Sequence, residues 1–465
     1  MASQEMRLER DSMGELEVPA NAYYGANSRR AELNFPISKL RFGRSFVKAI
    51  AQIKQSAAVV NLELGALDEE IASAIIVSAQ RVIDGEFDEE FIVDIFQTGS
   101  GTSTNMNANE VISNVAIEAL GGELGSRTPV HPNDHVNKGQ SSNDVIPTSI
   151  HLAAAGAIQD NLLPALKELE DSLRAKSEEF WGVVKTGRTH LQDATPIRLG
   201  QEFLGYTGQL ELAGARARTA LAELSVLALG GTAVGTGIGM HPEFSSRVIV
   251  RLRELTGLDL SETTNHFQAQ STLDAVVAAS GQLKSIAVGL LKIANDLRWL
   301  GSGPRAGIGE ITLPEVQPGS SIMPGKVNPV IAESVAMVSA QVIGNDTTIA
   351  IAGQSGNFEL NVMMPVAANN LLESIDLLST SAVNFAHQCV NGLEATGKGP
   401  EMVMQGLAIG TALAPIIGYD AAAGIAHEAS VSGENIREVA LRMTDLTEEQ
   451  LDEILEPLSM TEPKA

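Results

Sequence analysis

The chain has 465 residues and a formal net charge of −25 at pH 7, from 32 Lys and Arg against 57 Asp and Glu. This acidic excess repels polyanions and excludes nucleic acid as a partner class, so a small anionic ligand must meet local positive charge. One cysteine, Cys389, excludes an intramolecular disulfide framework and favours a reducing, cytoplasmic location. The charged first residues, MASQEMRLERDSMGELEVP, contain no apolar signal core, and we expect a soluble protein.

Three parts are expected along the chain. Residues 1–139 combine short helical segments with turns and the polar, glycine-rich stretch TGSGTSTNMNANE. Residues 140–395 contain long segments with helical periodicity, and residues 396–465 form a smaller part with a helix predicted over 434–442. We therefore predict a mainly α-helical protein with an N-terminal domain, a central long-helix bundle and a small C-terminal helical domain.

The central helices have recognisable caps and breakers. The predicted segments are one through Ile150 and Leu152 capped by Asn143 and Asp144, one over 166–180 after a break at Pro164, one over 197–229 ended by Gly230-Gly231, one over 273–300 ended by Gly301–Pro304, and one beginning at Pro329. Helices of this length need partners along their whole length, which predicts a bundle.

Some of these helices are apolar on more than one face. The segment 276–294 carries few charges, so one chain cannot cover it completely, and we expect oligomerisation through the bundle. The apolar stretch 330–352 contains Glu333, Asn345 and Asp346, which makes it a poor membrane span.

Several familiar chemistries do not match the sequence. The loop GSSIMPGK over 319–326 has five residues between its glycines and is followed by Val327, so it is not a Walker A loop. The glycines of 235–239 lack the third position of a dinucleotide fingerprint. Eight histidines without HExxH spacing predict no metal site, and residues 139–143 end in Asn where a nucleophile elbow ends in Gly.

Polar residues gather in four clusters, which are Thr98–Thr102, His131–Asp134 with Ser141–Asp144, Thr189–His190, and GSSIMPGKVNP over 319–329. They share small hydroxyls, amides, accessible backbone N–H groups, one His and one Lys, which suit carboxylate binding and oxyanion stabilisation. Each cluster also has a structural interpretation: a loop, a helix cap or a buried histidine. Lys326 has few acidic neighbours, which favours a bound anion, whereas Glu333 is either an exposed charge or a partner for a histidine.

The motifs QTGSGTSTNMNANEV, HPNDHVNKGQSSND, GRTHLQDATP and GSSIMPGKVNP, in this order, resemble the fumarase/aspartase superfamily. The likeness extends from RLERDSMGE to IGYDAAAGIA. It implies an almost all-helical three-domain subunit and a homotetramer whose central domains form one helical core. It also implies active sites assembled from three chains, with neither a metal nor an organic cofactor.

Within the superfamily, the chain is most similar to the class II fumarate hydratases, which implies reversible hydration of fumarate to L-malate. Aspartate ammonia-lyase is the alternative. The stretches Thr98–Thr102, His131–Asp134 and Gln140–Asp144 favour the hydratase, whereas Ala22–Gly25 and Val342–Thr348 look more like aspartase. A lens-crystallin-like structural relative would be expected to lack catalytic residues, and those residues are present.

The resemblance implies a role for each polar cluster. Ser320 takes the C3 proton, Lys326 and Asn328 hold the aci-carboxylate, and His190 oriented by Glu333 handles the departing hydroxyl. Residue types leave open which of Ser320 and His190 is the base and which the acid. The expected substrate-binding residues are Ser100, Gly101, Thr102, Ser141, Ser142, Asn143, Thr189, Ser321, Lys326 and Asn328.

A second, non-catalytic dicarboxylate site is implied at His131, Pro132, Asn133 and Asp134, with a structural turn as the alternative. Two departures from the family pattern affect this region. Gly139 stands where a serine is usual, and Arg127 is out of register with the expected basic residue. The glycine removes one hydroxyl and is expected to loosen the adjoining loop, whereas the shifted position of Arg127 weakens the second site and leaves the catalytic assignment unchanged.

Overall fold

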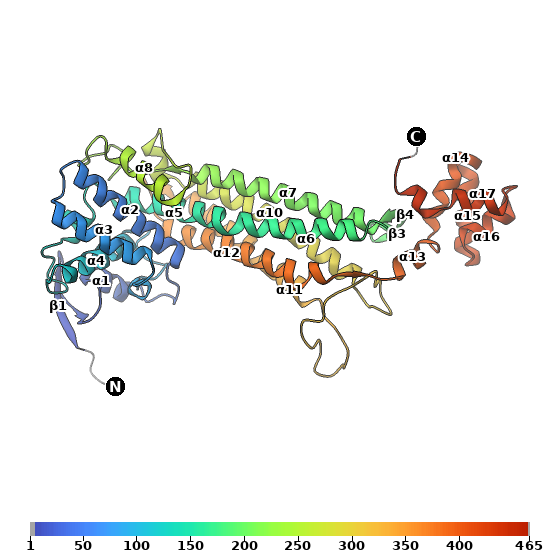
Figure 1. Ribbon diagram of the computed structural model, residues 1–465, viewed down its shortest axis with the longest axis horizontal. Helices are drawn as coiled ribbons and strands as arrows, with labels where there is room; N and C mark the ends of the chain where they lie inside the picture. The colour runs from blue at the N-terminus through green and yellow to red at the C-terminus, as the bar shows by residue number, and fades with distance from the viewer. Residues whose placement is uncertain (1–4, 464–465) are drawn as a thin grey trace. The chain divides into compact units, whose positions relative to one another are not determined.

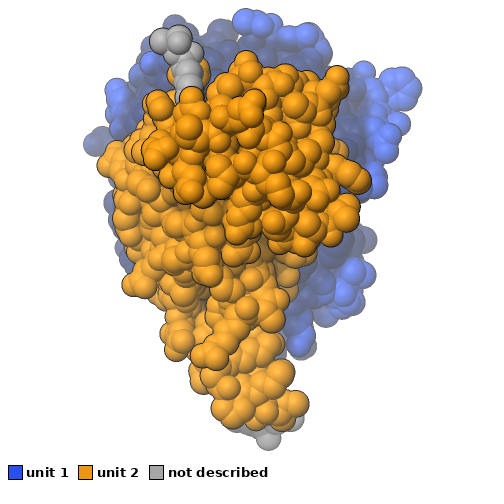
Figure 2. Space-filling model, turned by 90° about the vertical axis from the view of Figure 1, so that its right-hand side faces the viewer, with its two compact units in different colours: residues 1–164, 215–287, 340–379 blue, residues 165–214, 288–339, 380–465 orange. Residues whose placement is uncertain are grey.

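The computed structural model describes residues 5–463 and shows a predominantly α-helical protein (Figure 1). The sheets among the described residues are all two-stranded. The chain divides into two compact units, one of residues 1–164, 215–287 and 340–379 and the other of residues 165–214, 288–339 and 380–465 (Figure 2). The predicted mainly α-helical fold is confirmed.

The first unit contains the N-terminal hairpin and a group of packed helices. Its elements are β1 Met6–Asp11, β2 Gly14–Pro19, α1 Ala26–Asn34, α2 Arg44–Glu63, α3 Glu69–Ile83, η1 Asp88–Glu90, α4 Thr102–Ala119, η2 Pro132–Val136, α5 Ser142–Ala157, η3 Ile158–Leu162, β5 Val226–Leu227, α8 Phe244–Thr256, β6 Ser261–Glu262, α9 His266–Ser271, β8 Gly356–Asn357 and β9 Leu360–Asn361. The helices α2, α3 and α4 have 20, 15 and 18 residues, longer than the short segments expected here.

The length of α2 follows from its apolar stripe. Phe46, Ile50, Ile53 and Ala57 recur at helical spacing and are fully buried, where α2 packs against α3, α5 and α8. The ring of Phe42 stacks on Phe46 with 3.8 Å between centroids and covers the start of the helix. Burial of each large apolar side chain contributes about 2 kcal/mol to the free energy of folding, so packing stabilises this helix more than its intrinsic helix propensity does.

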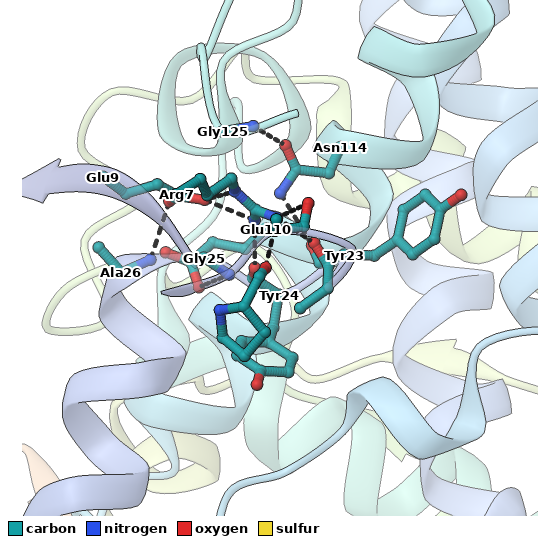
Figure 3. Close-up of polar contacts among 12 residues, drawn as sticks. Arg7, Glu9, Tyr23, Tyr24, Gly25, Ala26, Glu110, Asn114 and Gly125 are labelled. Carbon is teal, nitrogen blue, oxygen red and sulfur yellow. Dashed lines mark hydrogen bonds and ion pairs between the residues drawn. The ribbon is translucent and has the colours of Figure 1, made fainter. Parts of the chain in front are cut away.

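A buried carboxylate fastens the N-terminal segment to α4. The side chain of Glu110, on α4, accepts a hydrogen bond from the backbone N–H of Gly25 at 3.0 Å (Figure 3). It also accepts the backbone N–H groups of Asn27 and Ser28 at 2.9 and 3.0 Å and the Ser28 hydroxyl. Glu9 of β1 accepts from the Ala26 N–H at 3.0 Å. Both carboxylates therefore lie at the positive, N-terminal end of α1. The hydrogen bonds of Glu110 also fix the position of α4, whose first turn forms part of the polar region described below.

Five long helices, α6 Leu163–Glu179, α7 Leu199–Leu224, α10 Asp274–Leu300, α11 Val330–Gly353 and α12 Met364–Gln388, contribute residues to both units. The other elements of the second unit are β3 Val184–Thr189, β4 Gln192–Arg198, β7 Ile311–Thr312, η4 Val390–Gly392, β10 Glu394–Ala395, α13 Lys398–Val403, η5 Leu407–Leu413, α14 Ala414–Ile417, α15 Tyr419–Ser432, α16 Ile436–Met443, α17 Glu448–Ile454 and η6 Pro457–Met460.

Polar pairs join the long helices within each unit. In the first unit, Asp346 on α11 accepts from the Ser280 hydroxyl and the Lys284 ammonium on α10, at 2.8 and 2.6 Å. In the second, Tyr206 on α7 donates to Asp296 on α10 at 3.0 Å. These contacts support the predicted bundle. They also give polar partners to α10 and α11, which by length and composition alone are apolar enough to cross a membrane.

Three of the predicted helix boundaries need correction. The cap of α5 is Ser141 rather than Asn143 or Asp144, because its hydroxyl accepts the Asn143 N–H while Asp144 accepts the Ser141 N–H. The helix predicted to Leu229 ends at Leu224, since Val226–Leu227 pairs in parallel with Ser261–Glu262. The break predicted at Pro164 lies just before it, as the π-helical turn η3.

The last part of the chain has its own apolar core. Ile409, Leu413, Ile425, Val439 and Leu451 are buried together between η5 and helices α15, α16 and α17. Asn435 and Thr447 cap α16 and α17 with reciprocal side-chain hydrogen bonds. The helix predicted over 434–442 is thus found as Ile436–Met443, and the three-domain division stays a prediction.

Candidate active site

The loop Thr98–Thr102 leads into α4 and displays its hydroxyls at the helix N-terminus. Ser100 Oγ lies 2.9 Å from Thr102 Oγ1, so these hydroxyls pair with each other. Gly101 has φ +72°, a left-handed conformation that favours glycine, and a Cβ there would lie 2.9 Å from the Ile146 side chain. Gly99 is fixed as well, because its carbonyl accepts the Met364 N–H at 3.0 Å.

The segment Ser141–Asn143 forms the N-terminus of α5. Asp144 is fully buried, and its second oxygen accepts the N–H groups of Gly230 and Thr232 at 3.1 and 2.9 Å. Burial raises the pKa of Asp144, and these backbone donors, with that of Ser141, partly offset the rise. Asn143 is held by its amide, which donates to the carbonyl of Ala233 at 2.8 Å. The helix cap anticipated from the sequence is therefore present, and it fixes the polar residues beside it.

These two helix N-termini lie next to each other in the first unit. Asn105, one turn into α4, donates from its amide to Ser142 Oγ at 3.2 Å, and the Gly101 backbone packs against Ile146 of α5. The predicted residues Ser100, Gly101, Thr102, Ser141, Ser142 and Asn143 are thus brought together. Two adjacent helix N-termini, with hydroxyls and amides around them, form a site suited to a carboxylate.

A buried lysine lies behind this pair of helix termini. Lys54 of α2 is completely buried, and its ammonium donates to Asn137 Oδ1 and Gln140 Oε1, each at 2.9 Å. Asn137 Oδ1 also accepts from the Asn105 amide at 3.2 Å, which connects the lysine to Ser142 through two side chains. Sequence reasoning missed this residue. The signal was a lysine at a core position of the α2 apolar stripe.

The second predicted site forms a tight turn. His131 Nδ1 accepts the backbone N–H groups of Asn133 and Asp134 at 3.2 and 3.1 Å, so its ring proton is assigned to Nε2. The His131 N–H donates to His135 Nδ1 at 2.9 Å, and burial lowers the pKa of His135. Pro132 is buried while Asn133 and Asp134 face outward. This arrangement accounts for the turn, and a role in dicarboxylate binding stays a prediction.

In the second unit, Thr189 and His190 lie at the tip of the β3–β4 hairpin. Thr189 pairs with Gln192, which leaves His190 and Leu191 as a two-residue loop with φ +57° and +60°. Positive φ at two successive non-glycine residues costs about 1–2 kcal/mol each. The exposed imidazole is therefore presented on a tight, strained turn, as is common at functional sites.

A buried ion cluster holds the base of this hairpin. Arg188, just before Thr189, donates to Glu310 through two nitrogens at 2.8 and 3.1 Å. Lys185, which is 1% exposed, lies 2.7 Å from Glu202 and 3.1 Å from Glu310. Burial raises the pKa of Glu202, and the charge of Lys185 partly offsets this. The cluster fixes the strand that carries the histidine.

The loop 319–328 closes on itself. The Asn328 amide donates to the Gly319 carbonyl, and a Cβ on Gly319 would lie 1.7 Å from the Lys326 carbonyl oxygen. Ser320 Oγ accepts the backbone N–H groups of Ile322 and Met323 at 3.3 and 3.1 Å. Ser320 and Asn328 are half-buried, whereas Ser321 and Lys326 are exposed. Two backbone N–H groups of the loop are therefore directed at Ser320 Oγ.

Lys326 and Glu333 line one cavity of about 660 Å³, together with Arg298, Trp299 and Asn295. Ser320 and Lys326 line a neighbouring hollow of about 440 Å³. Within residues 5–463, the residues that line these two cavities include neither Thr189 nor His190. No hydrogen bond or ion pair joins His190 to Glu333 within residues 5–463. The predicted residues of the second unit thus fall into two groups within one chain.

Comparison with known proteins agrees with this architecture. Residues 14–344 match the family described as Lyase, and residues 409–462 match the Fumarase C C-terminus. Fold and polar clusters together define a lyase.

Relatives over the full length narrow this class. The chain is 51% identical to a class II fumarate hydratase from Methylorubrum extorquens, over all of this chain and 98% of that protein. It is 50% identical to a mitochondrial fumarate hydratase from Rhizopus oryzae, over all of this chain and 94% of the relative. The chain belongs to the class II fumarate hydratase family.

Solved structures show the same fold. A class II fumarase from Schistosoma mansoni superimposes with a TM-score of 0.96 at 40% identity, covering 98% of this chain and 99% of that one. A fumarate lyase/delta crystallin from Brucella melitensis bound to cobalt gives 0.95 at 45% identity, covering 99% and 100%.

Proposed function

We propose that this fumarate hydratase interconverts fumarate and L-malate with Ser320 as the base that removes the C3 proton of malate. In the elimination direction, the C3–H bond breaks and its electron pair moves into the adjacent carboxylate, giving an aci-carboxylate. The C2–O bond then breaks, and the hydroxyl leaves as water. The observation that supports this most directly is the pair of backbone N–H groups directed at Ser320 Oγ.

A serine is a weak base unless its deprotonated form is stabilised. The two N–H groups that Ser320 Oγ accepts favour the alkoxide, as does a lysine in the same loop. Lys326 and Asn328 are placed to bind the aci-carboxylate, whose extra negative charge exists only after proton removal. Each such donor contributes about 3 kcal/mol to the transition state.

His190 transfers the proton that turns the departing hydroxyl into water, and Glu333 orients its ring. Because no hydrogen bond or ion pair joins these two residues within residues 5–463, and His190 does not line the cavity that Glu333 lines, we assign them to different copies of the chain. A strained hairpin tip with an exposed imidazole is suited to reach into a neighbouring subunit. Ser100, Gly101, Thr102, Ser141, Ser142, Asn143, Thr189 and Ser321 bind the two substrate carboxylates.

The assembly that follows is a homotetramer with composite sites and three domains per subunit, divided at 139/140 and 395/396. Apolar side chains on the long helices support it, since Leu204, Leu212, Val288 and Met337 are all exposed in the isolated chain. Covering them with other copies removes from water the apolar surface of α7, α10 and α11. We infer subunit contacts there rather than a membrane.

The remaining assignments follow from the same residues. No metal or organic cofactor is needed, because backbone donors and Lys326 supply the stabilisation. The net charge of −25 disfavours nucleic acid. Burial raises the pKa of Cys389 to about 12, so its thiol is unreactive, which suits the cytoplasm. The turn at His131, Pro132, Asn133 and Asp134 is proposed as a second dicarboxylate site.

Replacement of Ser320 tests the base. We expect Ser320→Ala to lose at least roughly 10²-fold in kcat while the oligomer and its melting temperature persist, because the side chain is at the exposed loop. Ser321→Ala is the matched control and should act mainly on KM. A near-normal kcat for Ser320→Ala would remove Ser320 from the mechanism.

Ultraviolet absorbance of the fumarate double bond tests the substrate. The signal should rise with L-malate and stay flat with L-aspartate. Release of ammonia from aspartate at a comparable rate would instead support the aspartase alternative.

A further inference from the structure

We infer that Lys54 is a positioning residue for the dicarboxylate, because its ammonium organises the loop 137–140 and gives the Ser141–Asn143 site a buried positive charge. This inference rests on the proposed function, since it concerns the same carboxylate-binding residues. It adds a group from α2 that makes no direct contact with them.

The side chains of the loop 137–140 are arranged around the Lys54 ammonium. Its Nζ binds Asn137 Oδ1 and Gln140 Oε1 at 2.9 Å, and the Asn137 amide donates to the Gln140 carbonyl at 3.2 Å. The Gln140 amide in turn donates to the carbonyls of Val136 and Lys138 at 3.1 and 3.2 Å. The residue that follows this loop is Ser141, the cap of α5, so the ammonium fixes where the carboxylate site begins.

The same ammonium is linked to the site by hydrogen bonds. Asn137 Oδ1, already bound to Lys54, accepts from Asn105 Nδ2, which also donates to Ser142 Oγ. Asn105 is 1% exposed and Lys54 is fully buried. The region between the lysine and a carboxylate bound at Ser142 is therefore largely shielded from water. Because water screens the lysine charge only weakly there, that charge attracts the bound carboxylate even without direct contact.

The elements packed against α2 carry several charged groups, and one of these acts on Lys54. The charged and titratable groups on elements packed against α2 include Asp144 on α5, His135 and Lys138 beside the loop, and Arg247 on α8, which pairs with Glu63. Burial lowers the pKa of Lys54 to about 7, and the charge of Asp144 partly offsets this. Among the described groups, Asp144 is the one that acts on it.

A dianion at the site favours the ammonium, so bound ligand and bound proton stabilise each other. Burial lowers the Lys54 pKa to about 7 in the free protein, and the charge of a bound dianion is expected to raise it. Affinity is therefore full below pH 7 and declines as the pH rises through 7 towards the pKa of the complex. Binding near this range takes up a proton.

Succinate, an unreactive four-carbon dicarboxylate, is the probe. The inhibition constant of succinate is measured from pH 6 to pH 9 for the wild type and for Lys54→Met, with thermal melting as a check on folding. We expect the variant to bind succinate at least roughly tenfold more weakly at pH 6, and this ratio should fall towards pH 9, where the wild-type lysine is neutral and keeps only its hydrogen bonds to the loop. A purely structural role would give the same ratio at every pH, and that result would overturn the inference.

Proton uptake provides a readout that does not depend on the variant folding. Calorimetric titration with succinate in two buffers of different ionisation enthalpy should show about half a proton taken up per site near pH 7.5 and less at pH 6. His190→Asn and His131→Asn are the controls, and Asn tolerates the positive φ of residue 190. The uptake should persist in both controls and vanish in Lys54→Met. Its absence from the wild type, or its loss in either control, would contradict the inference.

Failure of the proposed function has a different signature. In that case wild-type protein would neither hydrate fumarate nor bind succinate at any pH.

Discussion

Gly319 allows the loop 319–328 to close, which makes Gly319→Ala a direct test of the closed loop. A Cβ at this position would lie 1.7 Å from the Lys326 carbonyl oxygen and 2.6 Å from its carbon. Roughly 1.3 Å of movement is needed before even a tight contact of about 3 Å is restored. The atoms that must move are backbone, so no side-chain rotation relieves the clash.

That displacement separates the groups assigned to the chemistry. The Gly319 carbonyl accepts a hydrogen bond from the Asn328 amide. Ser320 follows Gly319 on one side of this close backbone contact, and Lys326 lies on the other side. A misplacement of about 1 Å costs on the order of 10²-fold in rate, or about 2.7 kcal/mol. We therefore expect Gly319→Ala to lower kcat/KM by roughly 10²-fold. The melting temperature should change little, because much of the loop is exposed.

The assay is the fumarate absorbance with L-malate, together with melting and size-exclusion chromatography. Gly325→Asn is the matched control: residue 325 has φ +78°, which Asn tolerates, and a Cβ there meets nothing within 4 Å. A Gly319→Ala enzyme within about threefold of the wild type would refute the closed loop as the active arrangement.

Two further predictions concern the hairpin that carries His190. Glu310→Gln should destabilise the protein by about 3 kcal/mol and lower kcat, because it leaves Lys185 and Arg188 without a charged buried partner. The control is Glu462→Gln, in an exposed pair with Arg198, which should change the melting temperature little. Equal effects of the two variants would contradict a special role for the buried cluster. Leu191→Gly should stabilise the protein by about 0.5–1 kcal/mol in thermal melting, since it relieves a positive φ and the side chain is 63% exposed; a lower melting temperature would show that the turn is not strained.

Much of the fold follows from local sequence patterns. The bundle, the end of α10 at Leu300 and the C-terminal helix were predictable from apolar periodicity and from Gly and Pro breakers. The end of α7 was not, because Val226 and Leu227 pair with residues more than thirty positions later. The cap of α5 was misplaced by two to three residues, although its Ser-x-x-Asp pattern is visible in the sequence.

The polar clusters were predictable as segments, while their grouping was not. Nothing in the spacing of Asn105 and Ser142 indicates that their side chains form a hydrogen bond. Lys54 was missed because lysines are usually solvated, and only its position on an apolar stripe marked it as buried. The separation of His190 from Glu333 is likewise a property of three-dimensional packing.

The central claim is that one active site takes His190 from one copy of the chain and Lys326 from another, and subunit mixing tests it directly. His190→Asn and Lys326→Met are each prepared as inactive proteins, mixed, unfolded together and refolded, and fumarate hydration is measured. The account predicts that the mixture regains activity, because some hybrid sites then contain both native side chains. A mixture that stays as inactive as its parents, although hybrids form, would contradict it.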